Sequence, residues 1–342
     1  MRILLTGSAG FIGTAVADAL AAAGDEVVGV DLMLPEAHGS ADPPAGTHRL
    51  DVRDAPSWVH LLRGVDVVVH QAALVGLGAR VADLPAYASH NDLGTAALLA
   101  AMHEGGVRRL VLASSMVVYG EGRYVCATHG PQRPGERRVE GLEAGRFENP
   151  CPRCGTPLAW APVDEDAPVA PRSAYAAGKL AQEQYAAAWA RQTGGAVVAL
   201  RYHNVYGRGM PRDTPYSGVA AMFRSSVERG EAPQVFEDGL QMRDFVHVDD
   251  VARANLLAGR AAREAAGFAA YNVCSGTPVS ILDVARTVAG DGPAPEVTGR
   301  YRLGDVRHVV ASPERAAREL GFRARVAPTG GLAAFRHEPL RV

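Results

Sequence analysis

The chain has 342 residues, of which 47% are apolar, and its formal net charge is −2 at pH 7. This length and composition allow one large α/β unit or two domains, and a near-neutral chain without a basic block argues against nucleic acid as the main partner. No apolar run approaches about 18 residues and a predicted strand begins near Met1, so we expect no signal peptide, no membrane span and a cytoplasmic location.

The first predicted elements form a strand, a glycine-rich turn and a helix. Residues 3–5 form a short apolar strand, Gly7, Gly10 and Gly13 follow at three-residue spacing, and an alanine-rich helix continues to about residue 23. This order is the one that a dinucleotide-binding loop requires. Gly7 would permit the tight turn, Gly10 the approach of the backbone to a pyrophosphate, and Gly13 close packing of the helix. Two helix residues should also contact the cofactor, namely Phe11 and Ile12.

A second strand, residues 26–30, ends at Asp31, where the adenosine ribose should lie. The carboxylate would accept hydrogen bonds from the ribose hydroxyls and repel a 2′-phosphate, which favours NAD over NADP. The three glycines alone could be ordinary turns. Together with the flanking strand, the helix and Asp31, they indicate an NAD site.

Further strands are predicted at residues 48–50, 65–70 and 108–113, with a helix over residues 87–104. The alternation of strands and helices predicts an α/β fold of the Rossmann type, with a doubly wound parallel sheet. Ligands bind such sheets beyond the carboxyl ends of the strands. We therefore expect further cofactor contacts at Asp51, Val52, Ala72, Ala73 and Asn91. Asp51 could reach the adenine amino group, or it could only cap the helix before Trp58.

A polar insertion, residues 121–166, interrupts the alternation and contains three of the four cysteines. Cys126 and His129 form one pair separated by two residues, and Cys151 and Cys154 form another. Such pairs resemble a zinc knuckle, and a bound metal would fold a loop that has no core. The alternatives are free thiols or a disulfide between Cys151 and Cys154, which is uncommon in the cytoplasm. We expect a structural zinc ion.

A helix beginning near Ser173 carries Tyr175 and Lys179, and Lys179 is the sole lysine of the chain. Residues i and i+4 share one face of a helix, so the ammonium should lie near the phenol and lower its pKa toward neutrality. Lysine is a compact point donor, unlike the planar arginine fork, and could also bind both hydroxyls of the nicotinamide ribose. The alternative is an ordinary surface pair, which the uniqueness of this lysine disfavours.

After a sixth strand, residues 196–200, the pattern changes to shorter mixed elements. We expect residues 1–200 to form the NAD-binding domain and residues 201–342 mainly a smaller mixed α/β substrate lobe, interleaved with the first. Three arginines of this lobe, Arg243, Arg302 and Arg307, suit a diphosphate. For Arg307 a salt bridge is an equally good interpretation.

Together these motifs resemble the extended short-chain dehydrogenase/reductase family, in its nucleotide-sugar epimerase branch. The matching motifs are Gly7-x₂-Gly10-x₂-Gly13, the Ser115 segment, Tyr175-x₃-Lys179, Asn204 and Arg243-Asp-Phe-Val-His-Val-Asp-Asp. The resemblance implies catalysis by Ser115, Tyr175 and Lys179. It also implies substrate binding by Ser115, Asn204, Arg243, Arg302 and Asp305, and a homodimer paired through the helices near residues 87–104 and 173–193.

Some relatives carry an acid pair after the serine position, and these acids serve dehydration or decarboxylation. Here Met116 and Val117 stand there, and neither can transfer a proton. A 4-epimerase acting on a dTDP- or UDP-hexose through a transient 4-keto sugar is therefore the leading hypothesis. A 4-ketoreductase is the enzymatic alternative, and a non-catalytic NAD sensor or scaffold is the alternative of another class. The insertion, with residues 119–122 and 215–219, resembles family members that act on dTDP-sugars, and this resemblance favours a dTDP-sugar. His203 replaces a Phe expected from the family.

Overall fold

The computed structural model describes residues 1–39, 41–76, 80–212 and 218–341. Residues 213–217, which belong to the segment that favoured a dTDP-sugar, lie outside the described residues.

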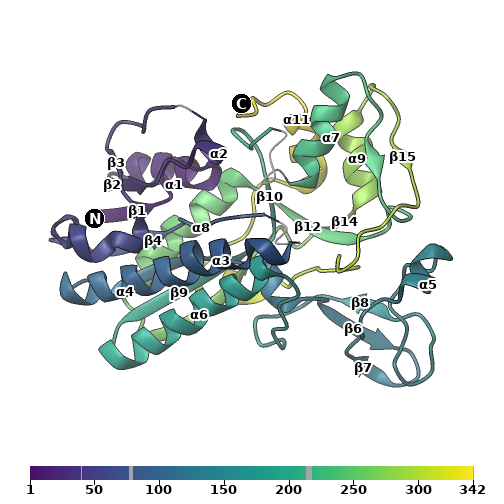
Figure 1. Cartoon of the computed structure of the whole chain (residues 1–342), viewed down its shortest axis with the longest axis horizontal. Helices are drawn as coiled ribbons and strands as arrows, with labels where there is room; N and C mark the ends of the chain where they lie inside the picture. Colours follow the sequence, from purple (N-terminus) through teal and green to yellow (C-terminus); the bar gives the residue numbers. More distant parts are fainter. Residues whose placement is uncertain (40, 77–79, 213–217, 342) are drawn as a thin grey trace.

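A parallel sheet of seven strands in the described chain is the centre of the fold (Figure 1). In spatial order the strands are β13 (Gly267–Val273), β9 (Ala196–Tyr202), β5 (Arg109–Ser115), β4 (Val67–His70), β1 (Arg2–Thr6), β2 (Glu26–Asp31) and β3 (Thr47–Arg49). Every neighbouring pair is parallel. The strand order reverses between β1 and β4, and such a switch point is where open α/β sheets bind ligands. The predicted doubly wound fold is confirmed.

Helices cover both faces of this sheet because its strands are apolar on both sides. On one face, α1 (Phe11–Ala22) and α8 (Val248–Ala261) pack over Leu5 and Val69. On the other face, α4 (Gly94–Glu104), α6 (Ala174–Thr193) and the 3₁₀ segment η1 (Val52–Leu62) pack over Leu4 and Val68. Figure 1 shows α4 and α6 side by side along the lower edge of the molecule.

The helix predicted over residues 87–104 is divided in three. It begins with α3 (Leu84–Tyr87), continues through a π-helical turn, η3 (Ala88–Leu93), and ends with α4. Such π-turns are rare and often occur at functional sites. Asn91, a predicted cofactor residue, lies in this turn. Other short helical segments of the described chain are α2 (Pro35–His38), η2 (Val81–Asp83) and η4 (Met116–Tyr119).

The second lobe is built mainly on short strands. A small sheet contains β10 (Asn204–Tyr206), β12 (Met242–His247) and β14 (Pro278–Ser280), and β11 (Gln234–Val235) pairs with β15 (Glu296–Val297). Its core lies between these strands and α7 (Val219–Glu228), α9 (Ile281–Ala289) and α11 (Pro328–Phe335). In contrast, β13 is a strand of the large sheet, and the helices α8 and α10 (Glu314–Glu319) pack against this sheet. The two parts are thus interleaved in sequence.

The insertion forms a unit at one end of the molecule (Figure 1). Its antiparallel strands are β6 (Arg123–Cys126), β7 (Gly130–Gln132) and β8 (Ala159–Ala161), and α5 (Val139–Glu143) lies between β7 and β8 in sequence. Its core is small: Tyr124, Cys126, Cys151 and Leu158 are buried, with Trp160 packed against them. Among the described residues, no helix combines the length and apolar character needed to cross a membrane.

Candidate active site

The loop after β1 owes its shape to two glycines. Gly7 has a φ of +67°, and a Cβ there would lie 2.7 Å from the backbone nitrogen of Ala72. A Cβ at Gly13, in the first turn of α1, would lie 1.9 Å from the carbonyl oxygen of Gly7. No side chain tolerates either approach, so glycine is required for the loop and helix to pack this closely. The amino end of α1 therefore opens beside the loop, which suits phosphate groups.

A cavity of about 390 Å³ lies beyond the carboxyl ends of β1, β2, β4, β5 and β9, a size typical of ligand pockets. The predicted cofactor residues that line it are Gly7, Gly10, Phe11, Ile12, Gly13, Asp31, Asp51, Val52, Ala72, Ala73, Tyr175 and Lys179. Ser115 and Asn204, predicted to contact the substrate, line the same cavity. One cavity thus joins the glycine-rich loop to the predicted catalytic residues.

Asp31 ends β2 with its carboxylate at this cavity. The backbone amides of Ala9 and Met33 donate hydrogen bonds to it at 3.0 and 2.8 Å, and His38 Nε2 lies 3.4 Å from its Oδ1. Burial acts to raise the pKa of Asp31, but the His38 contact and the two amides together hold this pKa below its usual value. The ionised carboxylate can therefore accept hydrogen bonds from hydroxyl groups.

Two other predicted cofactor residues have structural partners. Asn91 is not among the described residues that line the cavity, and its side chain instead exchanges two hydrogen bonds with the backbone of Leu74, at 2.7 and 3.0 Å. Asn91 therefore holds the loop after β4 in place, and its direct contact with the cofactor stays a prediction. Asp51 both lines the cavity and caps η1, because it accepts a hydrogen bond from the backbone amide of Arg53 at 2.8 Å. The cap is therefore observed, and the contact of Asp51 with the adenine amino group stays a prediction.

The predicted catalytic residues converge from β5 and α6. Ser115 ends β5, and Tyr175 lies in the first turn of α6, whose N-cap is Ser173. Lys179 follows one turn later and is 4% exposed; its Nζ donates a hydrogen bond to the carbonyl of Ala113 at 2.8 Å. The same Nζ lies 6.0 Å from the centroid of the Tyr175 ring. The alternative of an exposed surface pair is wrong, because both side chains face the cavity.

The expected lowering of the tyrosine pKa is wrong for the protein by itself. Burial raises the pKa of Tyr175 to about 12, and a hydrogen bond with Ser115 offsets only part of this rise. Burial also lowers the pKa of Lys179 to about 7, against the attraction of Glu183. A largely desolvated lysine is only partly charged near neutral pH, so it cannot strongly stabilise a tyrosinate.

Three predicted substrate residues of the second lobe, Arg243, Arg302 and Asp305, are not among the described residues that line this cavity. Arg243, on β12, donates hydrogen bonds to the carbonyl oxygens of Arg307 and Val306 at 2.8 and 2.6 Å. The Arg302 guanidinium lies 4.9 Å from the centroid of the Phe236 ring. Asn204, which does line the cavity, donates a hydrogen bond from Nδ2 to the carbonyl of Asp244 at 2.8 Å.

Arg307 is a buried salt-bridged residue. Its side chain is fully buried, and Nη1 lies 2.8 Å from Glu237 and 2.7 Å from Asp238. Its Nη2 lies 2.6 Å from Glu148 of the insertion. Three carboxylates engage this guanidinium, so the prediction that Arg307 contacts a diphosphate is wrong and the salt-bridge interpretation is correct.

His203 lines the cavity between Tyr202 and Asn204 and is 3% exposed. Neither of its ring nitrogens has a hydrogen-bond partner among the described residues. Burial lowers the pKa of His203 to about 3, so the ring is neutral. Buried polar atoms without partners are costly, and here they lie where a ligand could satisfy them. The feature of the sequence that pointed to His203 was that a histidine stands where the family resemblance led us to expect a Phe.

His38 and Arg341 are among the cavity residues that were not predicted from the sequence. His38 contacts Asp31, and Arg341 donates a hydrogen bond to the carbonyl of Ala9 in the glycine-rich loop at 2.5 Å. Neither belongs to a motif. Arg341 reaches the loop from the other end of the chain, so only the tertiary fold brings it to the cavity.

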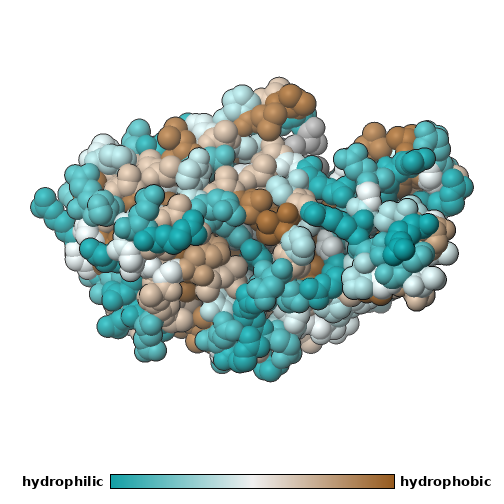
Figure 2. Space-filling view, turned by 90° about the horizontal axis from the view of Figure 1, so that it is seen from below, coloured by the Kyte–Doolittle hydropathy of each residue, from teal (hydrophilic) through white to brown (hydrophobic). Residues whose placement is uncertain are grey.

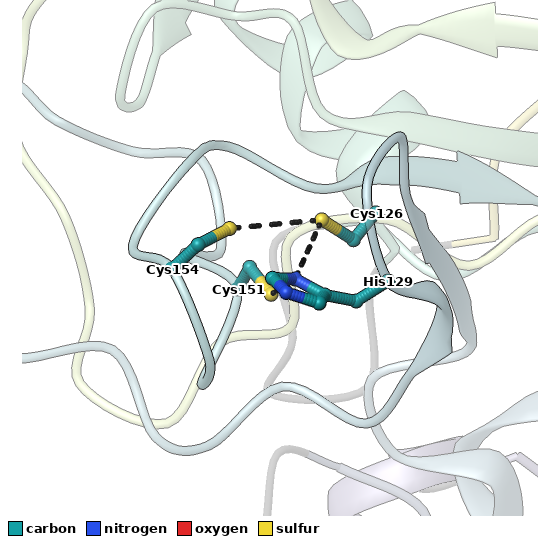
Figure 3. Close-up of side chains that lie close together, drawn as sticks. All are labelled: Cys126, His129, Cys151 and Cys154. Atoms are coloured by element: carbon teal, nitrogen blue, oxygen red, sulfur yellow. Dashed lines mark hydrogen bonds between the residues drawn. The ribbon is translucent and has the colours of Figure 1, made fainter.

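The insertion brings the predicted metal ligands together (Figure 3). The ligand atoms of Cys126, His129, Cys151 and Cys154 all lie within 4.8 Å of one another. The Cys126 sulfur lies 3.5 Å from His129 Nδ1 and 3.8 Å from the Cys154 sulfur, and the Cys151 sulfur lies 3.6 Å from His129 Nδ1. Cys126, Cys151 and Cys154 form no disulfide. Tetrahedral zinc, with bonds of about 2.3 Å to sulfur and about 2.0 Å to nitrogen, has edges of about 3.4–3.8 Å.

The backbone has the same feature directly after each of the two ligand pairs. Each pair is followed at once by a glycine in the left-handed region: Gly130, with a φ of +67°, after His129, and Gly155, with a φ of +74°, after Cys154. The Gly155 amide donates to the carbonyl of Cys151 at 2.8 Å and closes a tight turn. The Thr156 hydroxyl lies 3.1 Å from the Cys154 sulfur, a contact typical of the groups that support metal ligands.

One family model and several known enzymes are similar to this chain in sequence. The family model described as "NAD dependent epimerase/dehydratase family" matches residues 3–138 and 154–274. A dTDP-L-rhamnose 4-epimerase from Burkholderia thailandensis is 35% identical over 94% of this chain and 90% of its own. A UDP-glucose 4-epimerase from Mycolicibacterium smegmatis is 32% identical over 97% of this chain and 96% of its own.

Solved structures agree with the sequence relatives. The UDP-glucose 4-epimerase of Thermus thermophilus in complex with NAD superposes with a TM-score of 0.75 at 30% identity, covering 98% of both chains. MoeE5 in complex with UDP-glucose and NAD gives a TM-score of 0.76 at 30% identity, covering 98% of this chain and 97% of its own. The family match omits residues 139–153, which include α5 and Cys151.

Proposed function

The chain belongs to the NAD dependent epimerase/dehydratase family, and from this premise we propose that it is an NAD-dependent nucleotide-sugar 4-epimerase. Relatives at 35% and 32% identity are named dTDP-L-rhamnose 4-epimerase and UDP-glucose 4-epimerase. The observation that carries the proposal is the single cavity that joins the glycine-rich loop and Asp31 to Ser115, Tyr175 and Lys179. The first of these relatives favours a dTDP-linked 6-deoxyhexose as the substrate.

The residues present fit the cofactor. Gly7 and Gly13 leave a cradle that a Cβ would fill, and the ionised Asp31 lies at the position for the ribose hydroxyls. Bound NAD⁺ would supply the oxidation and re-reduction of C4, together with a positive charge near Tyr175. Because burial raises the pKa of Tyr175 when the protein is alone, the tyrosine needs such an added positive charge to release its proton near neutral pH.

The chain's own residues would handle the proton and the position of the sugar. Tyr175 would accept the proton of the C4 hydroxyl as a general base and return it afterwards. Ser115, which already hydrogen-bonds Tyr175, would donate a hydrogen bond to the same sugar oxygen. Lys179, fixed by the carbonyl of Ala113, would hold the ribose hydroxyls of the cofactor. Asn204 and the Arg243 region would bind the nucleotide diphosphate.

The variant Tyr175→Phe tests this assignment. The substitution removes only the hydroxyl that exchanges the proton, so we expect turnover to fall by roughly 10²–10⁴-fold, the usual contribution of general acid–base catalysis. Bound NAD and affinity for UDP or dTDP should stay close to those of the wild type. C4 inversion is measured by NMR on UDP-glucose and dTDP-L-rhamnose without added cofactor. Wild-type turnover by the variant would eliminate Tyr175 as the base.

We also propose that the cluster of Cys126, His129, Cys151 and Cys154 holds a structural zinc ion. The 3.5–3.8 Å contacts, the two matched turns and the three-sulfur, one-nitrogen donor set support zinc. Four protein ligands would close the coordination shell, so this metal would take no part in the reaction. The small core of the insertion would leave metal binding as a main source of its folding free energy.

A homodimer is our further proposal, formed by α4 and α6 around a two-fold axis. Exposed apolar side chains near these helices support it: Leu93 is 56% and Tyr185 48% exposed. Viewed from the side of these helices and the insertion, the surface is hydrophilic with scattered hydrophobic patches (Figure 2). A shared interface would cover such patches.

A further inference from the structure

The insertion is joined to the loop that carries the predicted substrate residues Arg302 and Asp305. Two of its side chains hold the backbone where this loop ends: the Glu121 carboxylate accepts the amide of Arg307 at 3.2 Å, and the Tyr124 hydroxyl accepts the amide of His308 at 2.9 Å. Both acceptors are buried. Beyond the loop, the amide of Val163 donates to the carbonyl of Val310 at 2.8 Å.

In the cluster of Cys126, His129, Cys151 and Cys154, the last two residues lie close in sequence to Glu148, which links the insertion to Arg307 and His308. Glu148, three residues before Cys151, accepts hydrogen bonds from Arg307 at 2.6 and 2.9 Å and lies 2.9 Å from His308 Nε2. Asn149 donates to the Glu121 carboxylate at 3.0 Å, and its carbonyl accepts the amide of Leu158 at 2.9 Å. The turn closed at Cys151–Gly155 therefore fixes the residues that hold Arg307.

A second link runs through Arg137. Its guanidinium, 6% exposed, lies 2.7 Å from Glu237 and also donates to the carbonyl of Asp305 at 2.7 Å. Glu237 is buried with a φ of +55°, a conformation that non-glycine residues rarely adopt. The same carboxylate lies 2.8 Å from Arg307. The two arginines hold Glu237 in this conformation from opposite sides of the boundary between insertion and lobe.

Arg243 completes the chain of contacts. It is held by the carbonyl oxygens of Val306 and Arg307, so its position depends on the backbone that Glu121 and Glu148 fix. On the other side of the loop, α5 faces Phe236 across a second cavity of about 510 Å³. By contrast, among the described residues that line the cavity beside the glycine-rich loop, none belongs to the insertion.

From these contacts we infer that the insertion supports the loop that carries Arg302 and Asp305, and that metal binding at its cysteines sets the affinity for the nucleotide of the substrate but not NAD binding. The inference rests on the proposed function for the identity of the substrate. Without metal, half of the buried core of the insertion, Cys126 and Cys151, loses its anchor. Glu148 and Arg137 then lose their fixed positions, and the loop that carries Arg302 and Asp305 loses its support.

The experiment compares purified wild type with three single variants. Cys154→Ser removes an exposed ligand, Glu148→Gln weakens the link to Arg307 and leaves the ligands intact, and Arg153→Ala alters an exposed residue between two ligands as the matched control. Each protein is assayed for zinc by elemental analysis, for bound NAD after acid release, and for affinity to UDP and dTDP by calorimetry. Dialysis of wild type against a chelator, followed by added Zn²⁺, provides a measurement without substitution.

We expect one zinc ion per chain in wild type, Glu148→Gln and Arg153→Ala, and less in Cys154→Ser. Affinity for the better nucleotide should fall at least tenfold in Cys154→Ser, Glu148→Gln and chelated wild type, with bound NAD unchanged, and Zn²⁺ should restore the chelated protein. The coupling would be overturned if protein without zinc kept wild-type affinity for the nucleotide, or if Glu148→Gln did. It would also be overturned if purified wild type contained no zinc. Failure of wild type itself to bind either nucleotide would instead refute the proposed function.

Discussion

At the scale of single residues, Tyr175 and Lys179 line one cavity, and burial shifts the pKa of both. The unique lysine and its spacing from Tyr175 correctly predicted that both residues face one cavity. The expected effect of Lys179 on the tyrosine was wrong, because burial in the tertiary structure raises the pKa of Tyr175 and lowers that of Lys179. Desolvation depends on what packs around a group, and no local spacing encodes it.

Substitution of His203 should change the stability of the protein and its dependence on pH. His203→Phe removes two buried ring nitrogens that lack partners among the described residues, so the free energy of unfolding should rise by about 1–2 kcal/mol at pH 7. The folded-state pKa of about 3 lies below the unfolded value, so the unfolded chain binds one more proton between these pH values and wild-type stability falls on acidification. The stability gap between variant and wild type should therefore widen by about 1.4 kcal/mol per unit from pH 6 to pH 4.

Urea denaturation of both proteins across this pH range measures the gap. Other titrating groups are common to the two chains and cancel in the difference. A gap that stays constant with pH would show that His203 is protonated in the folded state, contrary to its burial.

At the scale of elements, patterns that are complete within a short stretch were predicted well. The β1–loop–α1 unit, the strands of the large sheet up to β9 and the N-cap of α6 at Ser173 all follow from local sequence. The π-turn around Asn91 was not predicted, because it keeps a helical pattern. Strand β13 was also missed: its alanines and Asn272 have weak β propensity, and only its pairing with β9 selects the strand.

The packing of α1 against its loop gives a prediction for this scale. Gly13→Ala places a Cβ 1.9 Å from the Gly7 carbonyl, so the loop must move. We expect bound NAD to be largely lost and the free energy of unfolding to fall by about 1–3 kcal/mol.

Gly330→Ala is the matched control. A Cβ at Gly330, in the first turn of α11, meets no described heavy atom within 4 Å. This variant should keep its NAD and be as stable as wild type or up to about 1 kcal/mol more stable. Full NAD content in Gly13→Ala would contradict the close packing of loop and helix.

At the scale of the whole molecule, function depends on contacts between distant segments. Glu148 and Arg307 are 159 residues apart in sequence, and Arg341 reaches the loop at Ala9 from near the opposite terminus. The sequence predicted that Cys126, His129, Cys151 and Cys154 come together because the spacing within each pair is local, but it could not show that these four residues lie beside the substrate lobe. It likewise left Arg307 open between two roles, since its three carboxylate partners come from two other segments.

In the proposed reaction, hydride leaves C4 of the sugar and returns to C4 within one cavity. The direct measurement uses a nucleotide sugar deuterated at C4, incubated with the purified protein without added NAD or reductant. We predict inversion at C4 with the deuterium retained at that carbon, as followed by NMR. Inversion with loss of the deuterium to solvent, or conversion only when NADH is added in stoichiometric amount, would contradict the account.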